Sequence, residues 1–313
     1  MTTERIGFVG LGHMGLPMAR RLAEAGYQVA GFDASAKVLA SLGGSDGISA
    51  APTLASVADA GTVILMLPDS DVVEQVLLGS ADLEGASPEG ASPEAGLLAG
   101  LEPGSMIIDM SSSDPSRTRE LAGRAGGLGI TLIDAPVSGG VAGAVAGSLT
   151  IMVGGPQEAF SAIRPVLETM GSRVVRAGDV GAGHAVKALN NLMSAAHLLA
   201  SSEALIAGRR FGLDPAVMLE IINGSSGRSG STELKWPRYV LTETYNAGFP
   251  VRLMVKDIKL ALAIERATGT PSAVSAATVA AWSEALEDLP PDADHTAIAR
   301  WLDQLPAVSS GDG

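Results

Sequence analysis

The pattern of apolar and polar positions changes character near residue 178. Before it, short apolar runs typical of buried strands alternate with segments of helical periodicity, which predicts a doubly wound parallel sheet. The expected strands cover residues 6–10, 28–32, 62–66, 105–109, 130–134, 149–153 and 172–176. The expected helices among them cover residues 16–22, 69–78, 114–125 and 157–170.

After residue 178 the strand patterns disappear and apolar positions follow a helical period. A long helix over residues 183–211 is expected first. Further helices should begin where residues that favour helix starts occur, near Asp214, Ser231, Pro250, Pro271 and Asp294. The sequence therefore predicts an α/β domain, residues 1–178, and an all-α domain, residues 179–313, joined by the long helix. The cleft between two such domains is a favoured place for a small-molecule site.

A glycine-rich turn follows the first expected strand. Its three glycines have the G-x-G-x-x-G spacing that lets a backbone approach a pyrophosphate, and the next helix would offer free N–H groups to an anion. A simple turn is the alternative, because the chain has 39 glycines and chance matches are easy. The strand before the turn and the helix after it favour a dinucleotide site. The expected cofactor contacts are Gly10, Leu11, Gly12, His13, Met14 and Gly15.

Asp33 ends the second expected strand, near the usual position of the acidic residue that binds an adenosine ribose. A carboxylate there would repel the 2′-phosphate of NADP, and Ala34 is not the arginine that would neutralise one. NAD is therefore expected as the cofactor, and NADP is less favoured. Asp33 could also be the N-cap of a helix starting at Ser35, which is compatible with either cofactor.

The loops at the carboxyl ends of the strands matter most, because ligands of open α/β sheets lie there. An ordinary turn or cap is the alternative for each serine taken singly. Residues 134–150 are too glycine-rich for a stable helix and are expected to be a rigid loop lining a pocket, whose adjacent glycines let N–H groups approach a carboxylate. The candidates in these loops are Leu67, Pro68, Ser111, Ser112, Ser138, Gly139 and Gly140.

Lys187 and Asn191 lie one helical turn apart in an apolar, alanine-rich segment and therefore share a face. A lysine buried on such a face must lose its proton or find partners, which suggests a group for proton transfer beside an amide that orients a substrate. The pKa of a free lysine is about 10.4, so base function requires that burial or a nearby positive charge lower it. Lys256 and Asp257 form a second charged cluster, which is either a surface ion pair or, given its apolar neighbours, partly buried.

Composition excludes several classes of function. The chain of 313 residues has 21 Lys+Arg against 34 Asp+Glu, a net charge of −13, and no basic block, so nucleic-acid binding is not expected. It has no cysteine, and its four histidines lack ligand spacing, so no metal site is expected. No apolar run is long enough for a membrane span and no leader is visible, so a cytoplasmic protein is expected.

The repeat at residues 84–94 is expected to be a mobile surface insertion; a lid is the less favoured alternative.

Together these residues resemble the β-hydroxyacid dehydrogenases, a family that includes 3-hydroxyisobutyrate dehydrogenase and tartronate semialdehyde reductase. The resemblance runs along most of the chain, and its motifs occur in the family's order. They are Gly10-x-Gly12-x-Met14-Gly15-x-x-Met18-Ala19, Met66-Leu67-Pro68, Asp109-x-Ser111-Ser112, Asp134-Ala-Pro-Val-Ser138-Gly139-Gly140, Gly181-x-Gly183-x-x-x-Lys187-x-x-Asn190-Asn191, and Lys256-Asp257.

The resemblance implies a Rossmann-type domain with a helical substrate and oligomerisation domain, and hydride transfer between NAD and a small 3-hydroxy acid or its semialdehyde. It implies that Lys187 is the general acid and base and that Asn191, with Asn190, orients the substrate. It further implies that Ser111, Ser138, Gly139 and Gly140 cradle a carboxylate and that Ser112 and Lys256 lie on the cofactor side. Family habit also implies a homodimer or homotetramer. Ser112 and Ser148 stand where threonine is usual in the family, and both keep a hydroxyl.

Other functions remain alternatives. An imine reductase has this architecture but usually lacks a lysine at this position. A decarboxylating 6-phosphogluconate enzyme is longer and typically carries histidine where this chain has Asn190. A dinucleotide-binding sensor that lost its chemistry is the non-enzymatic alternative, since a fold alone does not exclude it.

Overall fold

The computed structural model describes residues 4–42, 47–79, 95–290 and 292–306. The repeat at residues 84–94 lies outside the described residues. Backbone contacts divide the chain into two compact units, Met1–Lys187 and Ala188–Gly313. The division falls inside a long helix, beyond the boundary expected at residue 178, and the assignment of separate functions to two domains stays a prediction. Each unit is described by itself.

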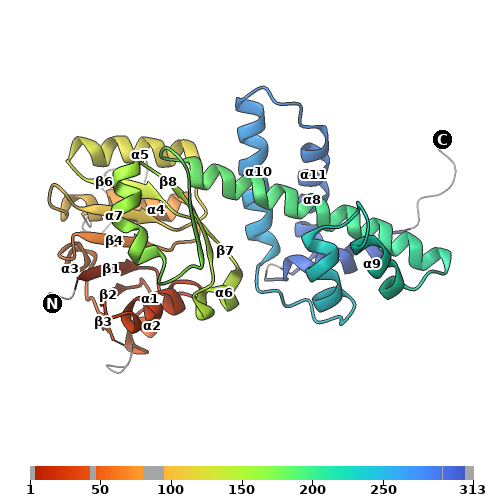
Figure 1. Cartoon of the computed structure of the whole chain (residues 1–313). Coiled ribbons are helices and arrows are strands. Elements are labelled where there is room, and N and C mark those ends of the chain that lie inside the picture. Colours follow the sequence, from red (N-terminus) through yellow and green to blue (C-terminus); the bar gives the residue numbers. More distant parts are fainter. Residues whose placement is uncertain (1–3, 43–46, 80–94, 291, 307–313) are drawn as a thin grey trace. The chain divides into compact units, whose positions relative to one another are not determined.

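The first unit contains one nine-stranded sheet in the order β3-β2-β1-β4-β5-β6-β8-β7, with β9 paired to β8 (Figure 1). The pairs from β3 to β6 are parallel, and β8 runs antiparallel to β6 and β7. The strands are β1 (Arg5–Val9), β2 (Gln28–Phe32), β3 (Ile48–Ala50), β4 (Thr62–Leu65), β5 (Met106–Asp109), β6 (Thr131–Asp134), β7 (Val137–Ser138), β8 (Thr150–Gly154) and β9 (Arg173–Gly178).

Helices cover both faces of this sheet, because alternate residues of the central strands enter two different hydrophobic clusters. Ile64, for example, packs with α1, α6 and α7, whereas its neighbours Val63 and Leu65 pack with α3, α4 and α5. This arrangement confirms the predicted fold class. The helices are α1 (Gly15–Glu24), α2 (Ala36–Ala40), α3 (Leu54–Ala58), α4 (Ser70–Leu78), η1 (Leu97–Ala99), α5 (Pro115–Gly127), α6 (Gly140–Ala146) and α7 (Gln157–Leu167).

The expectation of a continuous loop over residues 134–150 is wrong. The segment contains the short strand β7 and the helix α6, whose Gly143 and Ala144 are buried. A side chain on Gly143 would lie within 3.1 Å of Leu149, and α6 also contacts α1. Small residues therefore allow close packing here, and this packing outweighs the low helix propensity of glycine. The short elements β3 and α3 were also missed, because each is too short to show a clear period. The helix α2, which follows Ser35, was expected only in the alternative interpretation of Asp33.

The second unit is built from helices around one hydrophobic cluster (Figure 1). Its three tryptophans are buried, and each indole N–H has an acceptor: Ser202 Oγ for Trp236, the Ala195 carbonyl for Trp282 and Asp288 Oδ2 for Trp301. No helix in the described ranges is long and apolar enough to cross a bilayer. The helices are α8 (Ala182–Phe211), which begins in the first unit, α9 (Pro215–Asn223), the π-helix η2 (Ser231–Val240), α10 (Val251–Ala267), α11 (Ala273–Asp288), η3 (His295–Ala297) and α12 (Ile298–Gln304).

Candidate active site

The strand order reverses between β1 and β4, and ligands of doubly wound sheets bind at such a switch point. The turn after β1 lies directly against the residue after β4. Gly10 has a φ of 93°, and a side chain there would collide with the carbonyl oxygen of Met66. The glycine turn and the Leu67–Pro68 segment therefore begin at the same point of the sheet edge.

The three motif glycines have different reasons to be glycine. A side chain on Gly15 would collide with the Gly10 carbonyl oxygen, so Gly10 and Gly15 are required by the turn itself. A side chain on Gly12, by contrast, would meet no atom within 4 Å. The helix α1 that follows has no side-chain hydrogen bond at its N-cap, Met14. The open space above Gly12 and the uncapped helix start together fit a pyrophosphate group.

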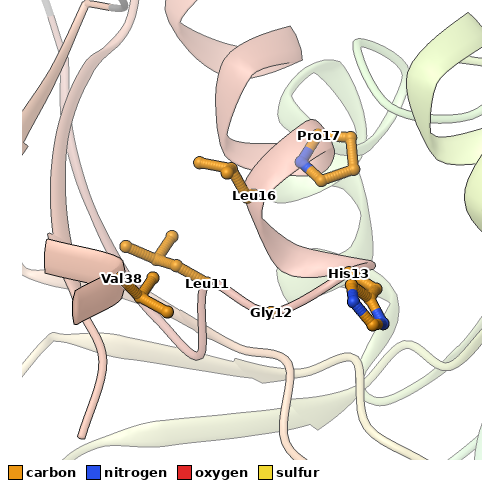
Figure 2. Close-up of a pocket in the computed structure, with 6 residues that line it drawn as sticks. All are labelled: Leu11, Gly12, His13, Leu16, Pro17 and Val38. Atoms are coloured by element: carbon orange, nitrogen blue, oxygen red, sulfur yellow. The ribbon is translucent and has the colours of Figure 1, made fainter. Parts of the chain in front are cut away.

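A pocket of about 450 Å³ opens at this turn (Figure 2). Three of the predicted cofactor contacts, Leu11, Gly12 and His13, line it. Leu16 and Pro17 of α1 and Val38 of α2 complete the wall, and they were not predicted. Apolar walls beside a backbone turn suit the flat faces of a dinucleotide.

Asp33 is fixed by two backbone groups. Its Oδ2 accepts a hydrogen bond from Leu11 N at 2.8 Å, and its Oδ1 accepts one from Ser35 N at 2.8 Å. The N-cap of α2 is Ser35, so Asp33 is not the cap that the alternative interpretation required. The carboxylate instead ties the end of β2 to the glycine turn, which holds it at the position expected for a ribose contact.

Ser111 joins two of the predicted strand-end loops. Its Oγ accepts a hydrogen bond from Leu67 N at 2.9 Å, and its own N–H donates to Asp109 Oδ1 at 2.9 Å. Ser111 is fully buried, whereas Ser112 is partly exposed and Pro68 is exposed. Ser138 is partly exposed at the end of β7, and Gly139 and Gly140 are exposed at the start of α6.

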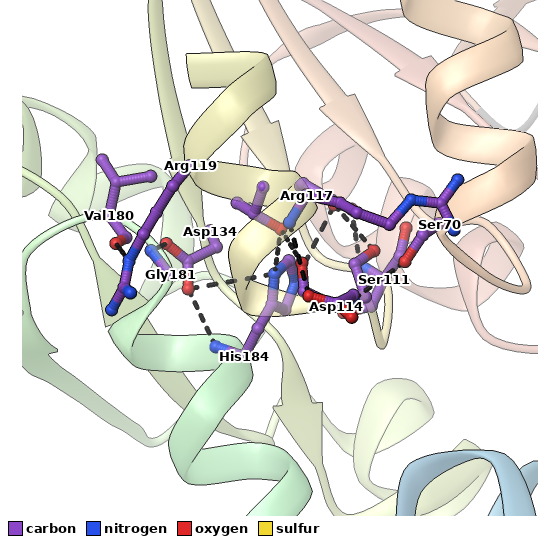
Figure 3. A network of polar contacts seen from close by, with 12 residues as sticks. Ser70, Ser111, Asp114, Arg117, Arg119, Asp134, Val180, Gly181 and His184 are labelled. Carbon is purple, nitrogen blue, oxygen red and sulfur yellow. Dashed lines mark hydrogen bonds and ion pairs between the residues drawn. The ribbon is translucent and has the colours of Figure 1, made fainter. Parts of the chain in front are cut away.

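A buried polar network, which sequence reasoning missed, lies beneath these loops (Figure 3). His184 of α8 is 1% exposed; its Nε2 is 3.0 Å from the Ser111 carbonyl oxygen and its Nδ1 is 2.9 Å from Thr118 Oγ1. Because a carbonyl oxygen only accepts, Nε2 carries a hydrogen. Two buried carboxylates flank the ring, Asp109 at 3.8 Å from Nε2 and Asp134 at 4.0 Å from Nδ1. His184 and both carboxylates stand inside the quoted motifs, but nothing local in the sequence signals their contacts.

Asp134 caps the start of α8 from the end of β6. Its Oδ1 accepts from Gly181 N at 2.6 Å and its Oδ2 accepts from His184 N at 2.8 Å (Figure 3). Burial raises the pKa of Asp134 above its ordinary value, and His184 and these backbone donors act in the opposite direction. The segment that leads to Lys187 is therefore attached directly to the sheet edge.

Lys187 and Asn191 occupy successive turns of α8, and both are buried, at 9% and 6% exposed. The Asn191 amide is oriented by Asp257 of α10, whose Oδ2 accepts from Asn191 Nδ2 at 2.6 Å. Asn191 Oδ1 also accepts from Nδ2 of Asn190, which is itself exposed. Within the second unit, the structure thus brings Asn190, Asn191 and Asp257 together.

Lys256 and Asp257 are not a surface ion pair. Asp257 is 1% exposed, and its Oδ1 lies 3.3 Å from Lys256 Nζ, at ion-pair distance but without hydrogen-bond geometry. Asp257 is therefore buried and Lys256 is partly buried, as their apolar neighbours predict. Across the described ranges, no group of three or more His, Cys, Asp or Glu side chains could hold a metal ion.

Comparisons with known proteins agree with this architecture. Residues 5–178 match the family model of the NAD-binding domain of 6-phosphogluconate dehydrogenase, and residues 181–302 match that of the NAD-binding region of NADP-dependent 3-hydroxyisobutyrate dehydrogenase. A 2-(hydroxymethyl)glutarate dehydrogenase of Eubacterium barkeri is 39% identical over 87% of this chain and 86% of its own length. A 3-hydroxyisobutyrate dehydrogenase of Pseudomonas aeruginosa is 41% identical over 82% and 84%.

Solved structures of known proteins are also similar to this chain. The 3-hydroxyisobutyrate dehydrogenase of Mycobacterium tuberculosis, solved with L-serine, is 30% identical with a TM-score of 0.84, over 96% of this chain and 99% of its own. Imine reductases also superimpose, but at 17% and 19% identity they share the fold alone.

The fold and the site define an NAD-binding oxidoreductase with a Rossmann-type domain. The chain belongs to the β-hydroxyacid dehydrogenase family, as the matches to both family models and to these relatives show. The nicotinamide cofactor predicted from the glycine turn and the enzyme class predicted from the motifs are confirmed.

Proposed function

We propose that this chain catalyses the reversible oxidation of a small 3-hydroxy acid to its semialdehyde, with Lys187 as general base in oxidation and general acid in reduction. NAD, when bound, accepts the hydride in oxidation and returns it in reduction. Gly12, the start of α1 and Asp33 would hold the cofactor, with Leu67, Pro68, Ser112 and Lys256 contributing further contacts.

The observation that carries this proposal is the fixed amide of Asn191, one helical turn from Lys187. The buried carboxylate of Asp257 requires the amide nitrogen to face it, which sets the direction of both polar atoms of Asn191. A pre-oriented amide beside a proton-transfer group suits positioning of a substrate hydroxyl. Ser138 and the N–H groups of the exposed residues Gly139 and Gly140 would receive the substrate carboxylate, while Ser111 holds the neighbouring loops in place.

The relatives narrow the substrate class. The acids named for two of them, 3-hydroxyisobutyrate and 2-(hydroxymethyl)glutarate, share one unit, a hydroxymethyl group on the carbon that bears the carboxylate. They differ in the third substituent, which is a methyl group in the first acid and a carboxyethyl group in the second. We propose that this chain acts on the shared unit, which serine and glycerate also contain; 4-hydroxybutyrate, which lacks this unit, is a further candidate.

Replacement of Lys187 tests the mechanism. Lys187→Met should lower kcat by about 10³-fold or more while the Kd for NAD changes by less than about threefold, because only the proton transfer is lost. Reduced-nicotinamide absorbance with a panel of hydroxy acids and amines measures both rate and substrate class. Retained activity would refute the role of Lys187. Turnover of amines alone would favour the imine-reductase alternative, and NAD binding without turnover of any substrate would favour the sensor.

We also propose that the chain forms a homodimer or homotetramer. Exposed apolar side chains in the second unit support this, since Val217 and Ile221 lie one turn apart on α9 at 52% and 64% exposed, and Phe211 at the end of α8 is 85% exposed. Analytical ultracentrifugation of the wild type and of Ile221→Lys measures it, and a monomeric wild type would refute it. A cytoplasmic location stays a prediction, and localisation of a tagged chain in cells tests it.

A further inference from the structure

The second unit contains a partly buried amine that the proposed mechanism does not use. Lys235 lies in η2, and its Nζ donates to Ser194 Oγ of α8 at 2.7 Å. None of the described Asp or Glu side chains forms an ion pair with it. Burial lowers the pKa of Lys235 to about 8, although the charge of Asp294 acts in the opposite direction. An amine held in this way lacks the counter-ion that a buried cation normally requires.

Asp294 is the acidic residue whose charge acts on the pKa of Lys235. Its carboxylate already accepts hydrogen bonds from other groups. Its Oδ2 accepts from Gly248 N at 2.7 Å and from Phe249 N at 3.1 Å, and its Oδ1 accepts from Thr296 N at 2.9 Å. The carboxylate therefore organises the turn before α10 and the start of η3, and among the described residues no carboxylate is in direct contact with Lys235.

His295 beside it supplies no competing positive charge. Its Nδ1 is 3.1 Å from the Phe249 carbonyl oxygen and must donate, so in the neutral ring Nε2 is unprotonated. Burial, together with the charge of Lys235, lowers the pKa of His295 to about 4. Lys235 is therefore the cation of this cluster.

The amine reaches the face of α8 that carries the proposed catalytic residues. Positions 187, 191 and 194 follow the i, i+4, i+7 pattern of one helical stripe. At a rise of about 1.5 Å per residue, Ser194 lies roughly 10 Å along the axis from Lys187. Side chains converging from these positions could hold the two ends of a molecule a few carbon atoms long.

We propose that Lys235 binds a second carboxylate at the far end of the hydroxy acid, so that this chain prefers dicarboxylic over monocarboxylic 3-hydroxy acids. The inference rests on the proposed function and specifies its substrate. A bound carboxylate would supply the anion that the protein does not, and the hydroxyl of Ser194 would orient the amine toward it. A fully exposed lysine would give little selectivity, whereas a partly buried one without a counter-ion gains a stronger, charge-assisted contact.

Two acids that differ only in the third substituent test this proposal. The full-length protein is assayed with NAD and either 3-hydroxyisobutyrate or 2-(hydroxymethyl)glutarate, and 2-(hydroxymethyl)hexanoate serves as a monocarboxylate whose third substituent is uncharged and of similar length. The wild type should favour the dicarboxylate by about tenfold or more in kcat/KM over both monocarboxylates. Lys235→Met should lower kcat/KM for the dicarboxylate about a hundredfold, mainly through KM, and change it for the monocarboxylates by less than about threefold.

Lys235→Arg should keep most of the preference, and Lys259→Met, which removes an exposed lysine of α10, should leave it unchanged. An equal loss with all three acids in Lys235→Met would assign Lys235 a purely structural role, and no loss with any acid would show that it does not contact the substrate; either result would overturn the inference. Melting curves identify a variant that has lost its fold, and the preference of Lys235→Arg then decides. A wild type that turns over the monocarboxylates as well as the dicarboxylate would overturn the inference but not the proposed function. A wild type that oxidises none of the panel would overturn both.

Discussion

His184 Nε2 and the carbonyl oxygen of Ser111 are 3.0 Å apart, which joins the first turn of α8 to the loop after β5. The two residues are 73 positions apart in the chain. One ring nitrogen thus connects the helix that carries Lys187 with the loop that meets Leu67.

Replacing His184 should destabilise the first unit. His184→Leu removes a donor from a buried carbonyl and a neighbour from two buried carboxylates, and should cost about 2 to 4 kcal/mol in the free energy of unfolding. His184→Gln keeps a donor near the Nε2 position and should cost less. Urea unfolding followed by circular dichroism measures both, with His197→Leu, at an exposed position of α8, as the control. Equal stability of His184→Leu and wild type would contradict the network.

The motif glycines should separate binding from folding. Gly12→Ala adds a methyl group into open space, so the melting temperature should hold while the Kd for NAD rises about tenfold or more. Gly15→Ala drives a methyl group into the Gly10 carbonyl and should lower the melting temperature instead. Calorimetric NAD titration and thermal melts check the pair. Unchanged NAD affinity in Gly12→Ala would show that no phosphate approaches this turn.

Preference for NAD over NADP should depend on Asp33. Its carboxylate would repel a 2′-phosphate, and Ala34 supplies no positive charge. The double variant Asp33→Ser with Ala34→Arg should shift the NADP/NAD ratio of kcat/KM by about a hundredfold toward NADP. Asp33→Asn, which keeps one acceptor for Leu11 or Ser35, separates loss of charge from loss of the turn. A ratio that does not move would exclude Asp33 from the cofactor site.

Asp257 should act through the amide of Asn191. Asp257→Ala frees that amide to rotate, so kcat should fall about tenfold to a hundredfold. Asp257→Asn retains an acceptor and should keep more activity. Asp292→Ala, at an exposed position, is the matched control. Full activity of Asp257→Ala would show that the amide needs no fixed orientation.

Acid should destabilise the second unit through His295. Burial lowers the pKa of His295 from 6.5 to about 4, so between these values the unfolded chain binds a proton that the folded chain excludes. The free energy of unfolding is therefore highest above pH 6.5. It should fall by roughly 3 kcal/mol through this one group as the pH falls toward 4.

His295→Asn preserves a donor at the Nδ1 position and does not titrate, so its free energy of unfolding should fall less over this range. Asp294 is present in both proteins, but His295 acts on its pKa, so the difference reports the two groups together. Tryptophan fluorescence reports the unfolding, because all three tryptophans lie in the second unit. Parallel pH curves for the two proteins would contradict the shift.

Much of the fold follows from local signals. The strand expected over residues 28–32 has those bounds, and Asp69, Asp114 and Asp214 are the N-caps of the helices expected to begin there. Caps and periodicity depend on neighbours within one turn, so the sequence carries them directly. The glycine turn and the shared face of Lys187 and Asn191 were predictable for the same reason.

The sequence by itself determined the alternation of elements, the long helix and the residue types that NAD and a hydroxy acid require. Only the tertiary structure decided that Gly140–Ala146 is a helix, that β8 runs antiparallel to β6, and that His184 meets Thr118 and Ser111. Those features depend on packing and hydrogen bonds between residues distant in the chain. A local sequence pattern does not show which distant residues will be in contact, because burial and charge pairing arise only when the chain folds.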